Sequence, residues 1–341
     1  MDKILVTGGL GFIGSHTVVE LQNAGFEVVI IDDLSNSSIK VLDGITAITG
    51  KKPIFEKLDL KEKSKVEDFF KKYSDIKGVI HFAASKAVGE SVNKPLMYYE
   101  NNLSTLVYLL KELAKLPKAS FIFSSSCTVY GQADELPITE NAPIKPAESP
   151  YGNTKQIGEE ILRDTCKVTP SLKGIALRYF NPVGSHESAK IGELPIGVPQ
   201  NLVPFITQTA IGIREQLSVF GDDYPTPDGT CIRDYIHVVD LAKAHVIALK
   251  RLLENNNKAN FETFNLGTGT GSSVLEVVQA FERVSGEKLN YKIVGRREGD
   301  IISAYADTTK ANNELGWKVQ LTLDDAMRSA WKWEQVVRKN G

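Results

Sequence analysis

The first half of the chain alternates short apolar, β-branched runs with longer segments of helical periodicity. This alternation is typical of a parallel sheet covered by helices. Runs such as 28–31 and 78–82 are almost continuously hydrophobic, as expected of strands that are buried on both faces. The pattern predicts an α/β fold, a Rossmann-type doubly wound parallel sheet, with strands at 3–7, 27–32, 53–58, 78–83, 119–125 and 173–179.

The second half is patterned differently. Gly/Pro-rich stretches occupy 184–199 and 221–231 before helical periodicity resumes. Such a composition suits a smaller domain with long binding loops. We therefore expect a first domain over 1–180 and a smaller C-terminal domain over 181–341, with segments near 233–270 able to return to the sheet.

Composition narrows the class of protein. A chain of 341 residues with 42% hydrophobic residues can bury a sizeable core. Its 40 basic and 42 acidic side chains give a net charge of -2, so no surface-wide positive field would attract nucleic acid or anionic lipid. The N-terminus already reads as a strand rather than a signal peptide, and no apolar run reaches the roughly 18 residues of a membrane span.

Cys127, Cys166 and Cys231 lie far apart and form no CxxC pair. Their spacing argues for a reducing compartment and against a structural metal. We expect a cytoplasmic protein that binds no metal and no nucleic acid and does not associate with membranes.

A glycine-rich turn follows the first predicted strand. The segment 8–14 reads GGLGFIG and is followed by a helix-compatible stretch. Glycines at this spacing let the backbone turn sharply, approach a pyrophosphate and present helix N-terminal amides to its charge. The second strand ends in Asp32 and Asp33, where a carboxylate can accept hydrogen bonds from ribose hydroxyls and would repel a 2′-phosphate. No arginine follows closely, so the pattern favours NAD over NADP. Without the carboxylates after the second strand, the glycine motif could equally be a turn that binds no ligand.

Two further strand ends can meet the dinucleotide. Asp59 follows the third predicted strand and can contact the adenine, although a capping or solvated role is equally open. Phe82 and Ala83 end the fourth strand and place a small residue beside the cofactor.

A candidate catalytic pair lies at the start of a predicted helix. Tyr151 and Lys155 form Tyr-x-x-x-Lys, so both side chains lie on one helix face. Ser126 ends the fifth predicted strand, at the sheet edge where ligands bind in doubly wound folds. A free phenol, with a pKa of about 10, is a poor base at neutral pH. We therefore expect the Lys155 ammonium and a positive nicotinamide to lower the pKa of Tyr151, and Ser126 to hydrogen-bond the reacting oxygen. Taken without the other motifs, Tyr151 and Lys155 could instead be two solvated residues.

These motifs resemble the extended branch of the short-chain dehydrogenase/reductase family, and longer stretches resemble its UDP-glucose 4-epimerases over essentially the whole chain. The stretches that carry the resemblance are 6–9, 11–16, 81–83, 86–91, 121–130, 149–152, 178–182, 233–237 and 296–300. The resemblance implies that Ser126, Tyr151 and Lys155 carry catalysis.

The resemblance also implies the binding residues. NAD would be held by Gly8, Gly11, Phe12, Ile13, Gly14, Asp32, Asp33, Asn36, Ser37, Asp59, Leu60, Phe82, Ala83, Lys86, Asn101, Tyr151, Lys155 and Tyr179. The UDP-hexose would be held by Ser126, Tyr151, Asn181, Asn201, Leu202, Phe220, Arg233, Arg297, Asp300 and Ala304. Guanidinium forks from separate loops suit diphosphate oxygens, although either arginine could instead form a surface ion pair.

The implied reaction interconverts UDP-glucose and UDP-galactose with retained cofactor. Tyr151 takes the 4-hydroxyl proton while C4 gives hydride to NAD; the 4-keto sugar turns over, and hydride returns to its opposite face. Tight binding of UDP and loose binding of the pyranose would permit this rotation. The resemblance further implies a homodimer formed through the helices near 96–115 and 151–166.

One position departs from many bacterial relatives. Ala304 stands where they often carry a bulky tyrosine, and a small side chain leaves room for a 2-acetamido group. We therefore expect UDP-N-acetylglucosamine and UDP-N-acetylgalactosamine as possible further substrates. The alternatives are an alanine without steric role, or a neighbour such as Tyr305 that refills the space.

Other activities fit the sequence less well. A sugar-nucleotide 4,6-dehydratase usually carries an Asp-Glu pair after the strand-five hydroxyl, whereas Cys127 and Thr128 follow Ser126 here. A net dehydrogenase and a non-catalytic NAD-sensing regulator stay open as alternatives, because a fold does not fix function.

Overall fold

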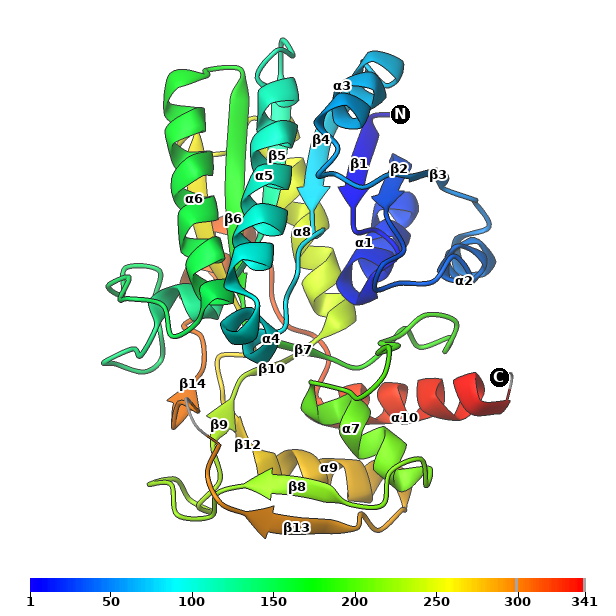
Figure 1. Ribbon diagram of the computed structural model, residues 1–341, viewed down its shortest axis with the longest axis vertical. Helices are drawn as coiled ribbons and strands as arrows, with labels where there is room; N and C mark the ends of the chain where they lie inside the picture. The colour runs from blue at the N-terminus through cyan, green and yellow to red at the C-terminus, as the bar shows by residue number, and fades with distance from the viewer. Residues whose placement is uncertain (298–299, 340–341) are drawn as a thin grey trace.

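A computed structural model describes residues 1–297 and 300–339 and shows a larger lobe, built on a sheet, above a smaller lobe (Figure 1). Neighbouring strands of the sheet all run parallel, in the order β11-β6-β5-β4-β1-β2-β3. The strands are β1 (Lys3–Thr7), β2 (Glu27–Asp32), β3 (Ile54–Lys57), β4 (Ile76–His81), β5 (Ala119–Ser126), β6 (Leu172–Tyr179) and β11 (Phe261–Leu266). Because the order grows in both directions from β1, the doubly wound α/β fold expected from the sequence is confirmed.

The predicted strands are confirmed, with ends that shift by at most two residues. The side chains of β1 alternate between the two faces of the sheet, as a strand requires. Ile4 and Val6 belong to one apolar cluster together with Leu249, whereas Leu5 belongs to a second cluster together with Leu106. Both faces of the sheet are therefore covered by apolar side chains, which explains the continuous hydrophobic runs.

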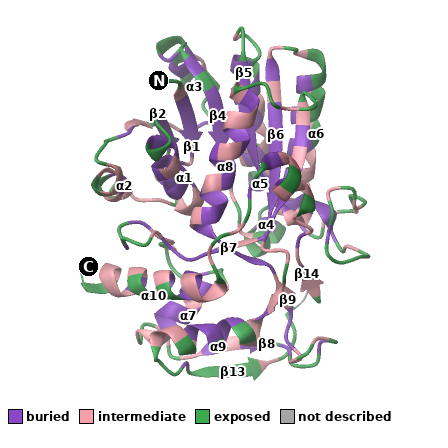
Figure 2. Ribbon diagram, turned by 180° about the vertical axis from the view of Figure 1, so that it is seen from behind, coloured by how far each residue is buried: buried purple, intermediate pink, exposed green. Residues whose placement is uncertain are grey.

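Helices cover both faces of the sheet. On one side lie α1 (Phe12–Asn23), α2 (Val41–Thr49) and α8 (Val238–Leu253); on the other lie α3 (Lys63–Lys72), α5 (Pro95–Leu113) and α6 (Pro150–Val168). Figure 2 shows most of the main sheet and much of α8 as buried. Short α4 (Val88–Asn93) follows β4, and a short 3-10 helix, η1 (Cys127–Tyr130), follows β5.

The seventh strand, β11, comes from the second half of the chain and pairs with β6 at the edge of the sheet. In contrast, β10 (Tyr235–His237) pairs with β7 (Asn181–Val183) outside the main sheet. The chain therefore passes between the lobes more than once.

The smaller lobe is built from short elements around its own apolar cluster, which includes Ile206, Phe281 and Met327. Its elements are α7 (Leu202–Ala210), β8 (Leu217–Phe220), β9 (Ile232–Arg233), β12 (Ser272–Ser273), α9 (Val274–Ser285), β13 (Tyr291–Val294), β14 (Ser303–Ala304) and α10 (Leu323–Lys339). A π-helical turn, η2 (Ala311–Leu315), packs against α8 and β11.

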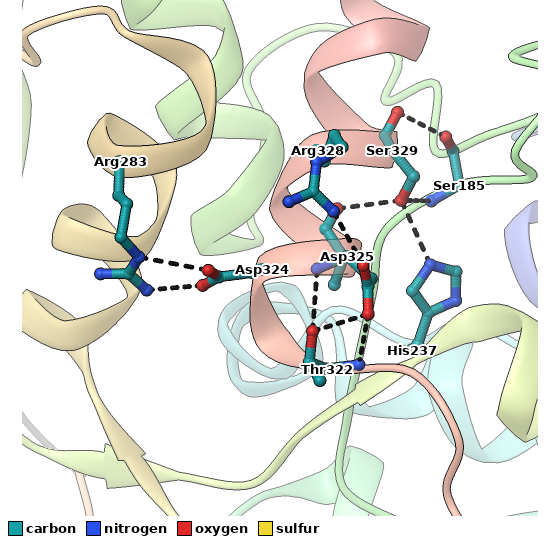
Figure 3. A network of polar contacts seen from close by, with 9 residues as sticks. Ser185, His237, Arg283, Thr322, Asp324, Asp325, Arg328 and Ser329 are labelled. Atoms are coloured by element: carbon teal, nitrogen blue, oxygen red, sulfur yellow. Dashed lines mark hydrogen bonds and ion pairs between the residues drawn. The ribbon is translucent and has the colours of Figure 1, made fainter.

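A polar network anchors α10 to this lobe (Figure 3). The Ser185 amide donates to Ser329 Oγ at 3.1 Å, and His237 Nε2 lies 3.2 Å from the same hydroxyl. Arg283 of α9 forms a two-pronged ion pair with Asp324 at 2.5 and 3.2 Å. These contacts fix the last helix against the loop after β7, the end of β10 and α9.

No helix within the described ranges is long and apolar enough to cross a membrane. Over the same residues, no three His, Cys, Asp or Glu side chains gather as a metal site would require.

Candidate active site

The glycine turn between β1 and α1 is packed so closely that side chains would not fit. A Cβ on Gly8, whose φ is +67°, would lie 2.9 Å from the Ala83 nitrogen, and a Cβ on Gly14 would lie 2.2 Å from the Gly8 oxygen. Gly11 caps α1 without any side-chain hydrogen bond, so the amides of Phe12 and Ile13 begin the helix uncapped by a side chain. Uncapped amides at the positive end of a helix attract a phosphate. The turn therefore fits the pyrophosphate of a dinucleotide.

The two carboxylates at the end of β2 lie beside this turn. Asp32 is buried, and its Oδ2 accepts a hydrogen bond from the Leu10 amide at 3.0 Å. Its Oδ1 accepts from the Leu34 amide and from Ser37 Oγ, at 3.0 and 2.7 Å. Asp33 is exposed, like the neighbouring predicted residue Asn36. Asp32 thus fixes the glycine turn to β2 while remaining at the edge where a ribose would lie.

The remaining cofactor candidates flank the same edge. Asp59 Oδ1 accepts from the Lys61 amide at 2.9 Å, so this aspartate stabilises the turn after β3. Leu60 beside it is buried. The amides of Phe82 and Ala83 donate to Thr7, at 3.1 Å to its carbonyl oxygen and 3.4 Å to its hydroxyl. This pairing holds the end of β4 against the glycine turn.

The Tyr-x-x-x-Lys pair lies on the first turns of α6. Ser149 caps that helix by accepting from the Gly152 amide at 3.1 Å, and Pro150 occupies its first position. Lys155 is buried; its Nζ donates to the Ser124 carbonyl oxygen at 2.7 Å and lies 5.7 Å from the centroid of the Tyr151 ring. The pair is therefore held against the carboxyl end of β5.

Two further hydroxyls meet at this strand end. Tyr179 at the end of β6 hydrogen-bonds the Ser124 hydroxyl. Ser126 accepts from the Thr128 amide at 3.2 Å and so begins η1. The structure brings Ser126, Tyr151, Lys155 and Tyr179 to the carboxyl ends of two adjacent strands, β5 and β6.

Burial is the main cause of the pKa shifts of Tyr151 and Lys155. Burial raises the pKa of Tyr151 to about 12, and a hydrogen bond with Ser126 acts in the opposite direction. Burial lowers the pKa of Lys155 to about 8, and the Glu159 carboxylate acts to raise it. Burial sets the direction of the Tyr151 pKa among the protein's own groups, and the expectation that the Lys155 ammonium and the nicotinamide charge together lower it stays a prediction.

Three predicted substrate residues meet in the smaller lobe. Asp300 Oδ1 accepts from Arg297 Nη2 at 2.7 Å and lies 3.4 Å from Arg233 Nη2. The Arg297 guanidinium lies 5.7 Å from the centroid of the Phe220 ring. The two arginines thus lie side by side, as a diphosphate would require. Glu298 and Gly299 of the 296–300 stretch lie outside the described residues.

An acidic residue that sequence reasoning missed joins a cofactor candidate to a substrate candidate. Glu193 Oε1 accepts from Asn201 Nδ2 at 2.6 Å and pairs with Lys86 Nζ at 3.7 Å. Asn201 caps α7, which begins at Leu202. Glu193 lies in a long loop without periodicity, so no sequence signal could have placed it there.

The other candidates are supported by neighbouring backbone or amide groups. Asn101 donates to Ser85 Oγ and Asn102 Oδ1, both at 3.1 Å, near the end of β4. The Asn181 amide donates to the Asp234 carbonyl oxygen at 2.9 Å.

Ala304 lies in β14 opposite Arg233 of β9. It is 4% exposed and packs in an apolar cluster with Val129, Tyr130 and Phe180. A larger side chain at 304 would therefore meet both this cluster and the neighbourhood of Arg233.

Known proteins are similar to this chain over nearly its full length. A family model described as GDP-mannose 4,6 dehydratase matches residues 5–330. Over 341 residues the chain is 49% identical to UDP-glucose 4-epimerase of Mus musculus, covering 98% of this chain and 97% of that relative. The chain belongs to the UDP-glucose 4-epimerase family.

Solved structures agree with this family assignment. UDP-glucose 4-epimerase from Stenotrophomonas maltophila, with bound NAD and formylated UDP-arabinopyranose, is 46% identical, with a TM-score of 0.96 and 100% of both chains covered. The enzyme from Bifidobacterium longum, in complex with NAD+ and UDP, is 48% identical, with a TM-score of 0.94 and the same coverage. The UDP-Glc/GlcNAc 4-epimerase of Campylobacter jejuni is 35% identical, with a TM-score of 0.84 and 98% of this chain and 100% of that chain covered.

Within the UDP-glucose 4-epimerase family, the residues after Ser126 bear on the type of reaction. Cys127 and Thr128 occupy the first positions of η1. Neither side chain is a carboxylic acid that could donate a proton for loss of water. The site therefore lacks the acid that a 4,6-dehydratase needs, although the matching family model is described as a GDP-mannose 4,6 dehydratase.

Proposed function

We propose that this protein interconverts UDP-glucose and UDP-galactose by inverting the configuration at C4, with NAD retained in the site. The observation that carries the proposal is the convergence of Tyr151, Lys155 and Ser126 at the carboxyl end of β5, on the same edge of the sheet as the glycine turn after β1. Family membership over the full chain supports the same reaction.

In this site Tyr151 exchanges a proton with the sugar 4-hydroxyl. Ser126 hydrogen-bonds the reacting oxygen and so orients it toward the phenol. Lys155 places a positive charge beneath the Tyr151 ring, where it stabilises the phenolate that accepts this proton. NAD bound at the glycine turn would take up hydride from C4 and return it.

The nucleotide part of the substrate is held in the smaller lobe. Arg233 and Arg297 bind the diphosphate, and Asp300 holds their guanidinium groups near one another because both contact its Oδ1. Phe220 at the end of β8 lies under the Arg297 guanidinium, and Asn201 at the start of α7 bonds Glu193. These polar groups bind the nucleotide part of the substrate. The pyranose is therefore free to rotate, so that either face of C4 can be turned toward the nicotinamide.

The proposal includes N-acetylated sugars as further substrates. Ala304 contributes only a methyl group next to Arg233, so a 2-acetamido group meets no bulky side chain at this position. A related enzyme from Campylobacter jejuni carries both sugar types in its name.

The proposal also includes a cytoplasmic homodimer. Helices α5 and α6 pack side by side on the outer face of the sheet, and each begins with a proline-initiated turn. A second copy of this helix pair would form a four-helix interface. Size-exclusion chromatography with light scattering measures the mass directly, and a monomeric mass would contradict this part.

The function is tested by incubating the purified protein with each UDP-hexose without added NAD and resolving the products by their stereochemistry. We expect a mixture of C4 epimers and no stoichiometric accumulation of free NADH. Accumulation of an oxidised sugar together with free NADH would instead indicate a net dehydrogenase, and loss of water would indicate a dehydratase.

A further inference from the structure

An acidic residue follows the catalytic pair on the same face of α6. Tyr151, Lys155 and Glu159 are spaced four residues apart, so their side chains lie one above another along the helix. Glu159 is 5% exposed and faces β5 and β6. A buried carboxylate one turn from a buried ammonium can influence that ammonium's charge.

Glu159 is held in place by three hydrogen bonds. Ser125 Oγ donates to Oε1 at 2.5 Å, and Arg178 of β6 donates from Nε at 2.8 Å and from Nη2 at 2.5 Å. The Glu159 and Arg178 side chains are 7% and 8% exposed. Replacing such a buried pair by apolar residues is often neutral or stabilising, so stability alone is a weak reason for its presence.

The pair is also connected to the smaller lobe. Arg178 Nη1 donates to Tyr130 Oη at 2.9 Å, and that hydroxyl donates to Asn265 Oδ1 of β11 at 2.6 Å. Asn265 Nδ2 donates to the Ile138 carbonyl oxygen at 2.9 Å, and the Ile138 amide donates to the Tyr305 carbonyl oxygen at 2.9 Å. Tyr305 directly follows Ala304. The network thus runs from the catalytic helix to β14.

The surroundings of Lys155 single out Glu159. Burial lowers the pKa of His81 on β4 to about 3 and raises the pKa of Tyr179 on β6, so both side chains are neutral near pH 7. Burial also raises the pKa values of Tyr151 on α6 and of its titratable neighbours Tyr98 on α5 and Cys127 of η1. Within the described part of the chain, Glu159 is the anion that influences Lys155. Its carboxylate raises the pKa of Lys155, whereas burial lowers it.

We propose that Glu159 is a positioning residue for the Tyr151/Lys155 pair: held by Arg178 and Ser125 one helical turn from Lys155, its carboxylate keeps Lys155 charged while Nζ bonds the Ser124 carbonyl oxygen of β5. This inference rests on the proposed function, in which the Lys155 charge stabilises the Tyr151 phenolate. Loss of the Glu159 charge makes Lys155 give up its proton more readily, and Tyr151 then loses its nearby cation.

The test compares Glu159→Gln with a matched control elsewhere in the fold. Arg251 of α8 and Glu262 of β11 form a second two-pronged pair, at 2.8 and 2.9 Å, whose side chains are 10% and 6% exposed. Glu262→Gln therefore removes one charge from a similar buried pair that lies away from Lys155.

We expect Glu159→Gln to move the alkaline limb of the kcat profile to lower pH by about one unit, with KM for UDP-glucose nearly unchanged. Glu262→Gln should lower thermal stability without moving that limb. Glu159→Asp, which keeps the charge, should restore most of the wild-type profile. Equal profiles in Glu159→Gln and Glu262→Gln would overturn the inference.

A second measurement does not depend on turnover. Titration of the Lys155 ammonium by ¹⁵N NMR, with Lys155→Met as the reference, reports the charge of Lys155 itself. We expect Lys155 to lose its proton at lower pH in Glu159→Gln and at the wild-type pH in Glu262→Gln; an unshifted titration in Glu159→Gln would overturn the inference even if the proposed reaction proved wrong.

If Glu159→Gln alone does not fold, the double variant Glu159→Gln/Arg178→Gln removes both charges and leaves no unpaired buried cation. The same shifts are expected from it. A wild-type pH profile in this double variant would show that the pair is only structural.

Discussion

Gly14→Ala tests whether the glycine turn binds a pyrophosphate. The added Cβ would lie 2.2 Å from the Gly8 oxygen and 2.9 Å from the Gly9 Cα, whereas ordinary contact begins at 3.4 Å, so the start of α1 must move by about 1.2 Å. Both obstacles are backbone atoms, which cannot rotate away. Overpacking of this kind costs about 1–3 kcal/mol of stability.

The same movement also disturbs the binding of NAD. Amide-to-oxygen hydrogen bonds span only about 2.7–3.2 Å, so a displacement of this size breaks one or two of those made to the pyrophosphate. Each charge-assisted bond contributes about 1.5–3 kcal/mol, so the affinity should fall by about 10- to 100-fold or more. We expect purified Gly14→Ala to have lost most of its NAD.

The assay measures the NAD released on denaturation, per mole of protein, and the melting temperature with and without added NAD. Gly89→Ala is the control, because Gly89 lies in helix α4 and its Cβ would meet nothing within 4 Å. This control should match wild type or gain about 0.5–1 kcal/mol. If Gly14→Ala retained a full complement of NAD, the steric argument would be refuted.

Three further outcomes are expected. Tyr151→Phe should fold and retain NAD while turnover falls by about 100-fold or more, because the proton acceptor is gone; unchanged turnover would remove Tyr151 from the mechanism. Ala304→Tyr should reduce turnover of UDP-N-acetylglucosamine far more than that of UDP-glucose, and equal losses on both would show overpacking of the apolar cluster rather than a gate. Burial lowers the pKa of His16 to about 3 and of His245 to about 4, so below about pH 6.5 the unfolded chain binds protons that the folded chain does not. Stability should therefore be complete above that pH and fall toward pH 4, by up to about 1.4 kcal/mol per pH unit for each histidine, and His245→Asn should flatten the slope in urea unfolding experiments; an unchanged slope would exclude His245.

The sequence by itself determined the features that depend on residues close together in the chain. Continuous apolar runs fixed β1 and β2 to the residue, because a strand buried on both faces has no polar positions. The glycine turn and the Tyr-x-x-x-Lys pair were readable because each depends on spacing within one turn or one helix. Glu159 stands at the same spacing, one helical turn after Lys155, but this spacing alone does not indicate a role for it.

Tertiary structure decided whatever depends on segments far apart in the chain. Only the fold brings β11 beside β6, joins Arg233 to Arg297 through Asp300, and sets Arg178 against Glu159. It also decided the direction of the Tyr151 pKa, because desolvation depends on everything packed around the ring, whereas sequence spacing supplies only its neighbours on the helix.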